Sequence, residues 1–120
     1  MERVTGIGGV FFRSQDPKGL VAWYAEHLGA PVQEDGYVVF TSERGAQVWS
    51  PFAADTDYWP REKQAMVNFT VPDLDAMLAQ LRGAGIQVDE RVEELDGVGR
   101  FGWGVDPEGN RFELWEPAAT

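Results

Sequence analysis

Cysteine is absent from this 120-residue sequence, histidine occurs once, and basic side chains are scarce. Without cysteine the chain has no disulfide bond, no thiolate metal ligand and no thiol nucleophile. Its 20 acidic and 10 basic side chains give a net charge of −10, which repels phosphate backbones and anionic lipid. We therefore expect an acidic, cytoplasmic protein that binds neither nucleic acid nor membrane.

Long apolar runs are lacking as well. No stretch reaches about 18 consecutive apolar residues, and the start, Met1–Gly6, places no apolar run behind a basic patch. There is also no phosphate-binding glycine loop, zinc-ligand spacing or Ser-His-Asp pattern. At 13.4 kDa the chain has the size of one domain, residues 1–120, and we expect neither a membrane span nor a signal peptide.

The sequence does contain one order of elements twice. Strands, predicted from apolar alternation and turn signals, lie at 4–13, 31–34, 36–41, 46–51, 66–71, 86–92, 98–105 and 110–116. One helix is predicted between the cap Asp16 and Gly29, and a second between Asp73 and Gly83. Between the halves, residues 52–64 lack any period and predict a long covering loop.

Pairs of corresponding residues give the spacing between the two copies. Phe12 recurs 57 positions later as Phe69, and Trp49 recurs 66 positions later as Trp115. The difference predicts about nine extra residues between the helix and the last strand of the second copy. We therefore expect an α+β fold of two βαβββ modules, at about residues 4–51 and 65–117.

These modules, together with the segments Trp23–Val32 and Val71–Ile86 and the ending Asp106–Trp115, resemble the vicinal oxygen chelate superfamily. That superfamily contains glyoxalase I, the extradiol dioxygenases and the bleomycin resistance proteins, and the resemblance covers nearly the whole chain. It implies a cupped mixed sheet with both helices on its convex face, a ligand cavity on the concave face, and a homodimer.

Metal-using members of the superfamily place one ligand on the first and one on the last strand of each module. By the two offsets, these places are Gly9, Gln47, Met66 and Glu113. Only Gln47 and Glu113 carry a ligating side chain here, whereas a catalytic metal normally takes three or more protein ligands. The sole histidine, His27, is expected at the end of the first helix. We therefore expect no metal cofactor, with a divalent ion held weakly by Gln47 and Glu113 as the alternative.

Strand alternation predicts which side chains line the cavity. The ligand-binding set combines charged, amide and aromatic side chains: Phe11, Arg13, Gln47, Trp49, Met66, Asn68, Phe101, Trp103, Glu113 and Trp115. Tyr58 and Trp59, in the loop at 52–64, are expected either to cover the cavity as a lid or to lie in a solvated connection. The opposite set, Val67, Phe69, Val71, Phe112 and Leu114, is apolar and predicts a core. A second hydrophobic core or a dimer interface would explain the same rings.

The role of Glu113 distinguishes the functional alternatives from a structural one. As the acid among tryptophans, it is expected to anchor a cationic ligand group or to act as a general acid or base. A salt bridge to Arg13, Arg100 or Arg111 would instead make its role structural.

Three functions follow. The first is a metal-free protein of the bleomycin-resistance type that binds a small aromatic or cationic molecule. The second is a glyoxalase-like lyase, isomerase or dioxygenase that uses Glu113 as catalytic base, or a metal at Gln47 and Glu113. The third is a structural partner whose cup is filled by another chain.

Overall fold

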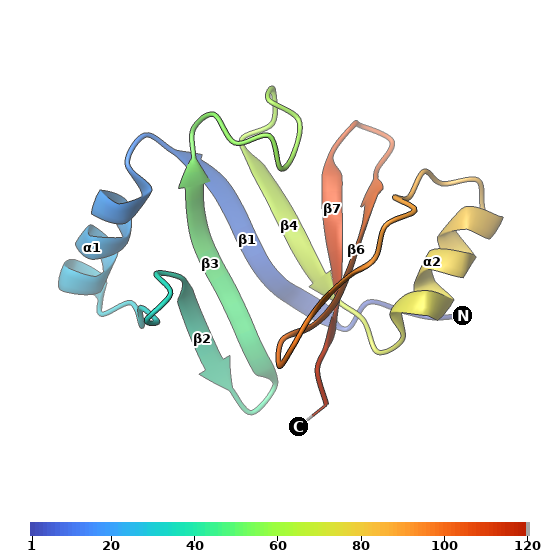
Figure 1. Cartoon of the computed structure of the whole chain (residues 1–120), viewed down its shortest axis with the longest axis horizontal. Coiled ribbons are helices and arrows are strands. Elements are labelled where there is room, and N and C mark those ends of the chain that lie inside the picture. Colours follow the sequence, from blue (N-terminus) through green and yellow to red (C-terminus); the bar gives the residue numbers. More distant parts are fainter. Residues whose placement is uncertain (120) are drawn as a thin grey trace. The chain divides into compact units, whose positions relative to one another are not determined.

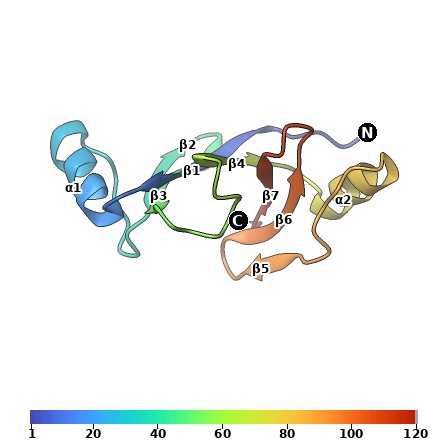
Figure 2. The ribbon, with the colours of Figure 1, turned by 90° about the horizontal axis from the view of Figure 1, so that it is seen from above.

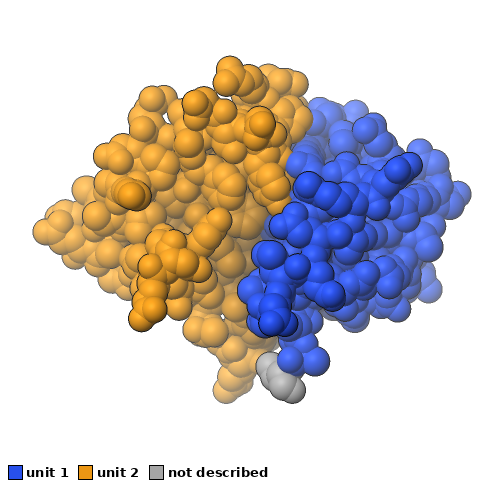
Figure 3. All heavy atoms as spheres, viewed as in Figure 1, with its two compact units in different colours: residues 1–7, 67–120 blue, residues 8–66 orange. Residues whose placement is uncertain are grey.

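The computed structural model describes residues 1–119, which form seven strands and two helices. They divide into two compact units (Figure 3). Unit 1 comprises Met1–Ile7 and the chain from Val67 onward, and unit 2 comprises Gly8–Met66. Each unit contains one of the two helices, and neither helix in the described part of the chain is long and apolar enough to cross a membrane.

Unit 2 holds the elements of the first module, apart from Gly6 and Ile7 at the start of its first strand (Figure 1). These are β1 (Gly6–Ser14), α1 (Pro17–Leu28), β2 (Val38–Ser42) and β3 (Gly45–Ala53). The strands are ordered β2-β3-β1, with β1 parallel and β2 antiparallel to β3. The Asp16 carboxylate accepts a hydrogen bond from the Gly19 N–H, and Gly29 adopts φ 68° after the last turn. Both predicted ends of this helix are confirmed.

Unit 1 holds the elements of the second module, apart from Ala65 and Met66 at the start of its first strand. These are β4 (Ala65–Thr70), α2 (Leu74–Gly83), β5 (Glu93–Leu95), β6 (Gly99–Val105) and β7 (Arg111–Pro117). The strands are ordered β4-β7-β6-β5; β4 and β7 are parallel, and the other pairs are antiparallel, as Figure 2 shows for β5 beside β6. Asp73 caps α2 through the Ala76 N–H, as its position in the sequence predicts.

The hairpin between β6 and β7 fixes the register around Glu113. Asp106 N–H donates to the Asn110 carbonyl, and the Asp106 carboxylate accepts from the Glu108 and Asn110 N–H groups. This closed loop pairs Trp103 with Glu113. The loop at 106–110 therefore places Trp103 directly beside Glu113.

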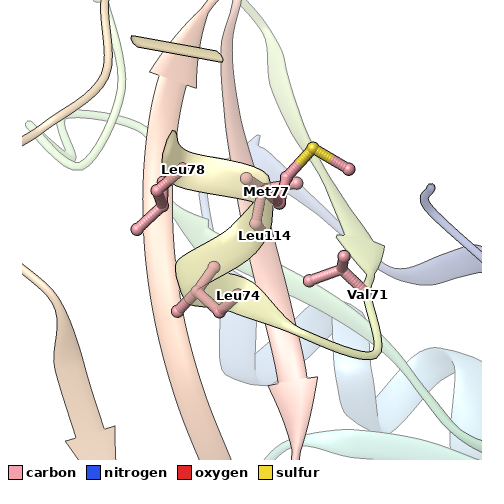
Figure 4. Packing of buried hydrophobic residues seen from close by; sticks show 5 residues of the cluster. All are labelled: Val71, Leu74, Met77, Leu78 and Leu114. Carbon is pink, nitrogen blue, oxygen red and sulfur yellow. The ribbon is translucent and has the colours of Figure 1, made fainter. Parts of the chain in front are cut away.

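One face of the unit 1 sheet is covered by α2, and the core lies between them (Figure 4). The buried cluster consists of Val71, Leu74, Met77, Leu78 and Leu114, with Phe69 and Phe112 packed against it. A Cβ at Gly102 would lie 3.2 Å from Leu78, so the small residue lets the helix approach β6. The predicted core residues Phe69, Val71, Phe112 and Leu114 lie in this cluster or against it, and the α+β fold class is confirmed.

Two predicted strands are wrong in detail. The segment 31–34 contains only an isolated bridge, Val32 to Val38, and the segment 86–92 only a bridge from Val88 to Gly104. In place of the second, the short strand β5 pairs with β6. Apolar residues near turns satisfied the strand pattern in both segments without continuous partners for their backbone groups.

Candidate functional site

The side chain of Glu113 lies at the centre of a polar group in unit 1. It is buried on β7, with 3% of its surface exposed. Its Oε1 accepts a hydrogen bond from Asn68 Nδ2 at 2.7 Å, and its Oε2 accepts one from Trp103 Nε1 at 2.9 Å. The register produces this arrangement, because Asn68 on β4 and Trp103 on β6 both lie directly beside Glu113. Two neutral side chains thus fix the orientation of the carboxylate.

Asn68 also presents an acceptor that the described chain leaves unsatisfied. Its Oδ1 is buried and has no hydrogen-bond partner among residues 1–119, while its Nδ2 is committed to Glu113. Reversing the amide would bring two oxygens together and leave the NH₂ group without its acceptor. A buried acceptor without a donor costs about 1–3 kcal/mol, so the position favours a bound donor.

Two guanidinium groups lie against Trp103, the tryptophan that donates to Glu113. The Trp103 ring lies against the guanidinium groups of Arg91 and Arg111, 4.9 and 5.1 Å from their Cζ atoms. Arg111 also forms an ion pair with Asp89 at 2.9 Å. Sequence reasoning missed Arg91, although it is the one basic residue in the acidic run at 89–96. Trp103 and Glu113 are both buried.

The predicted pair Phe101 and Trp115 is present on the same strands. Their rings stack with centroids 6.0 Å apart, and the Trp115 indole donates to the Val98 carbonyl. Met66 is buried and precedes Asn68 by two residues on β4, which places both on one strand face. Within unit 1, Asn68, Phe101, Trp103 and Trp115 therefore share the strand face of Glu113.

Two arginines proposed as salt-bridge partners of Glu113 are engaged elsewhere. Arg100 contacts Asp75 at 2.9 Å, and this hydrogen bond holds the pKa of the Asp75 carboxyl below its ordinary value. The same bond raises the pKa of Arg100. Arg13 lies in unit 2, where its guanidinium donates to backbone carbonyls of the 54–63 segment.

In unit 2 the residues predicted for the ligand face form a closed aromatic cluster. Phe11 packs against Phe52 at 5.4 Å, and Phe52 contacts Trp59 at 5.3 Å and Tyr58 at 5.8 Å. Trp59 is buried, and its indole donates to the Lys63 carbonyl. These rings pack on one another, as in a hydrophobic core.

The expectation that Gln47 and Trp49 share a face with Phe11 is wrong. Phe11 pairs with Ser50, whereas Trp49 packs against Phe12 and Tyr24 on the side of α1. Because faces alternate along a strand, Gln47 belongs to the Trp49 face. The face of Phe11 instead carries Ser50 and Phe52, which sequence reasoning missed.

The described part of unit 2 also contains an open groove of about 680 Å³. It lies between α1 and the end of β3, and the loop at 32–37 forms its third side. None of the residues predicted for ligand binding lines it.

The family model for the glyoxalase-like domain matches residues 9–115. This chain belongs to the glyoxalase-like domain family. The family assignment and the solved structures similar to it confirm the resemblance to the vicinal oxygen chelate superfamily. No curated protein matches the sequence of this glyoxalase-like domain.

Solved structures share the fold of this glyoxalase-like domain at low identity. Methylmalonyl-CoA epimerase from Streptomyces coelicolor, solved with 2-nitronate-propionyl-CoA, is 20% identical over 98% of this chain and 100% of that chain, with a TM-score of 0.74. The epimerase from Mycobacterium tuberculosis is 22% identical over 97% and 90%, with a TM-score of 0.67. The Mn(II)-bound glyoxalase from Novosphingobium aromaticivorans is 23% identical over 97% of this chain and 40% of that chain, with a TM-score of 0.73.

The donor set of this glyoxalase-like domain does not fit a catalytic metal. With Ser50 in the place first assigned to Gln47, the four family positions carry Gly9, Ser50, Met66 and Glu113. Only the last is an anionic oxygen donor, and neighbouring side chains donate hydrogen bonds to both its oxygens. Among residues 1–119, no three histidine or acidic side chains are grouped so that they would hold an ion. We therefore assign no chemical step to a metal.

Proposed function

We propose that this glyoxalase-like domain is a metal-free small-molecule-binding protein, of the type found among bleomycin resistance proteins. Its ligand would carry a cationic, hydrogen-bond-donating group that donates to Asn68 Oδ1 beside Glu113. The observation that carries the proposal is the buried Asn68 Oδ1 without a donor, next to a carboxylate. Two adjacent acceptors select a ligand that brings donors.

The electrostatics of the site support a cationic ligand group over a neutral hydrogen-bond donor. The donors to Glu113 from Asn68 and Trp103 are both uncharged. The aromatic rings of Phe101 and Trp115 on the same strands favour a cation over an anion through their negative faces. The chain's net charge of −10 attracts cations as well.

Three matched probes test this proposal: phenethylamine, its neutral analogue 2-phenylethanol and its anionic analogue 3-phenylpropionate. Binding is followed by the indole ¹⁵N–H signals of the five tryptophans, with the Trp103 signal assigned from Trp103→Phe. We expect the amine to shift the Trp103 signal. The neutral and the anionic analogue should bind more weakly than the amine by roughly tenfold or a larger factor. Equal binding of all three, or none with the amine up to millimolar concentration, would contradict the proposal.

Variants locate the site. Glu113→Gln keeps the shape of the side chain and removes its charge, so amine binding is expected to weaken at least roughly tenfold. Glu34→Gln removes an exposed acid in unit 2 and serves as the matched control, with unchanged binding expected. A loss of similar size in both variants would point to the overall field of the protein and not to a site.

The metal-free part of the proposal has a separate test. Protein purified without chelator is analysed by mass spectrometry for manganese, iron, nickel and zinc, and we expect far less than one ion per chain. A stoichiometric ion that is retained in the natural protein and lost in Glu113→Gln would overturn this part.

A second candidate function is proton transfer, in a glyoxalase-like isomerase or lyase. The observation that favours it is the fixed orientation of Glu113, since a catalytic base needs a held carboxylate. Two similar structures are those of epimerases. Solvent deuterium incorporation beside the carbonyl of α-keto hemithioacetals, lost in Glu113→Gln, would establish this function over simple binding.

We also propose a cytoplasmic homodimer. The superfamily resemblance supports the dimer, and β2 and β5 are edge strands within their units that a second chain would cover. Light scattering would then give 2 × 13.4 = 26.8 kDa for the particle.

A further inference from the structure

Arg13 uses all of its side-chain donors on one backbone segment. Nε donates to the Lys63 carbonyl at 2.9 Å. Nη1 donates to the carbonyls of Ala54 and Thr56 at 2.9 and 2.8 Å, and Nη2 to those of Trp59 and Pro60 at 3.1 and 3.0 Å. A guanidinium has five N–H donors, so each of them has a carbonyl acceptor here.

The surroundings of the guanidinium make this a built site. The Trp59 ring lies 5.2 Å from the Arg13 Cζ, and the Trp59 indole shares the Lys63 carbonyl with Arg13 Nε. Backbone bonds tie the same strand to the end of the segment, with Arg13 N–H donating to the Gln64 carbonyl and Gln64 Nε2 donating to the Arg13 carbonyl. All these residues belong to unit 2.

We propose that residues 54–63 form a guanidinium-binding site, lined by five carbonyl oxygens and one indole ring, whose resident ligand is the side chain of Arg13. The site takes a planar monosubstituted guanidinium. An ammonium has three donors on a single nitrogen and cannot reach carbonyls arranged around a plane. Lysine at position 13 would therefore not replace arginine.

Through these hydrogen bonds, Arg13 holds the 54–63 segment in place over Phe52 and Phe11. Opening the segment would expose Trp59 and release five hydrogen bonds at once, so Tyr58 and Trp59 stay packed on the aromatic cluster whether or not a ligand is bound. The proposal is independent of the function assigned to Glu113, which lies in unit 1.

Chemical rescue of an Arg13→Ala variant tests the proposal. The substitution removes the guanidinium and two methylene groups, which ethylguanidinium supplies again at tens of millimolar. Hydrogen exchange followed by mass spectrometry reports on the amides of Thr56, Tyr58 and Lys63, which are hydrogen-bonded within the segment. We expect exchange there to accelerate roughly tenfold or more in Arg13→Ala and in Arg13→Lys.

Ethylguanidinium is expected to slow the exchange of Arg13→Ala toward that of the natural protein, and ethylammonium at the same concentration is not. Arg44→Ala, in the exposed turn before β3, is the matched control, and its segment 54–63 should exchange as in the natural protein. Exchange that is unchanged in Arg13→Ala would overturn the proposal. So would acceleration, local or throughout the chain, that ethylguanidinium fails to reverse or that ethylammonium reverses equally.

Discussion

Trp103 and Trp115 carry the same indole group in two different roles. Both rings are buried in unit 1, but the Trp103 N–H donates to the Glu113 carboxylate and the Trp115 N–H to the neutral carbonyl of Val98. A hydrogen bond to a charged group contributes more than one to a carbonyl, and losing it leaves a buried charge less solvated.

Replacing each tryptophan by phenylalanine separates these roles, because both changes remove the same atoms. We expect Trp103→Phe to lower the free energy of unfolding by about 1–2 kcal/mol more than Trp115→Phe does. Urea denaturation followed by far-UV circular dichroism measures both values. Equal losses would mean that the indole contributes only packing and that Glu113 finds another donor.

At the scale of elements, polar groups tie the first turn of α2 to the strands below it. The Leu74 N–H donates to the Glu116 carboxylate at 2.8 Å, and Arg100 on β6 forms its ion pair with Asp75. Carboxylates near a helix N-terminus interact favourably with the helix dipole. The position of α2 over the sheet thus depends on charge as well as on its apolar face.

The Asp75 pair predicts a local pH dependence. Its hydrogen bond to Arg100 lowers the pKa of Asp75, so the pair stabilises the fold above the pKa of Asp75 in the unfolded chain, and this contribution is lost as pH falls through the folded value. Carbon-13 NMR titration is expected to give a lower pKa for Asp75 in the natural protein than in Arg100→Gln. A pKa that is the same in both would show that the ion pair does not persist in solution.

Glycines at the start of β6 give a second prediction at this scale. Gly97 and Gly99 both have positive φ, at 76° and 137°, but a Cβ on Gly97 would meet no atom within 4 Å, whereas one on Gly99 would collide with the Glu116 carbonyl. We expect Gly97→Ala to cost about 1 kcal/mol and Gly99→Ala about 3 kcal/mol or more. Thermal unfolding of both variants checks the order, and equal costs would show that β6 and β7 separate readily there.

The sequence was sufficient where local chemistry decides an element. Asp16, Gly29 and Asp73 fixed three helix ends through capping and a positive φ, and the Asp106 turn fixed the register around Glu113. Each of these signals acts within a few residues, so no distant partner is needed to interpret it.

The sequence pattern did not predict the register between strands that lie far apart in the sequence. The match of Trp49 with Trp115 gave an offset of 66, but Phe11 pairs with Ser50 as Asn68 pairs with Glu113, and 113 − 50 gives 63. The error of three positions is odd, so it moved Gln47 and Trp49 to the opposite face. Similar residues at similar distances from a turn do not report which backbone groups pair.

The net charge of the whole molecule affects stability and ligand binding in a way that no single ion pair reveals. Ion pairs such as Arg100 with Asp75 and Arg111 with Asp89 engage only part of the 20 acidic side chains, and the net charge of −10 makes the remainder repel one another. The same negative field that disfavours the compact chain attracts a cationic ligand. Stability and ligand affinity should therefore respond to salt in opposite directions.

We expect the melting temperature to rise by roughly 2–5 °C between low salt and 0.5 M sodium chloride, because screening weakens the repulsion. Over the same range the affinity for phenethylamine should fall, although the part contributed by buried Glu113 persists. Glu43→Lys, in the exposed turn between β2 and β3, should raise the melting temperature at low salt and flatten both dependences. Calorimetry and NMR titration at matched salt concentrations test this, and an affinity that is independent of salt would show that the overall charge of the protein does not contribute to binding.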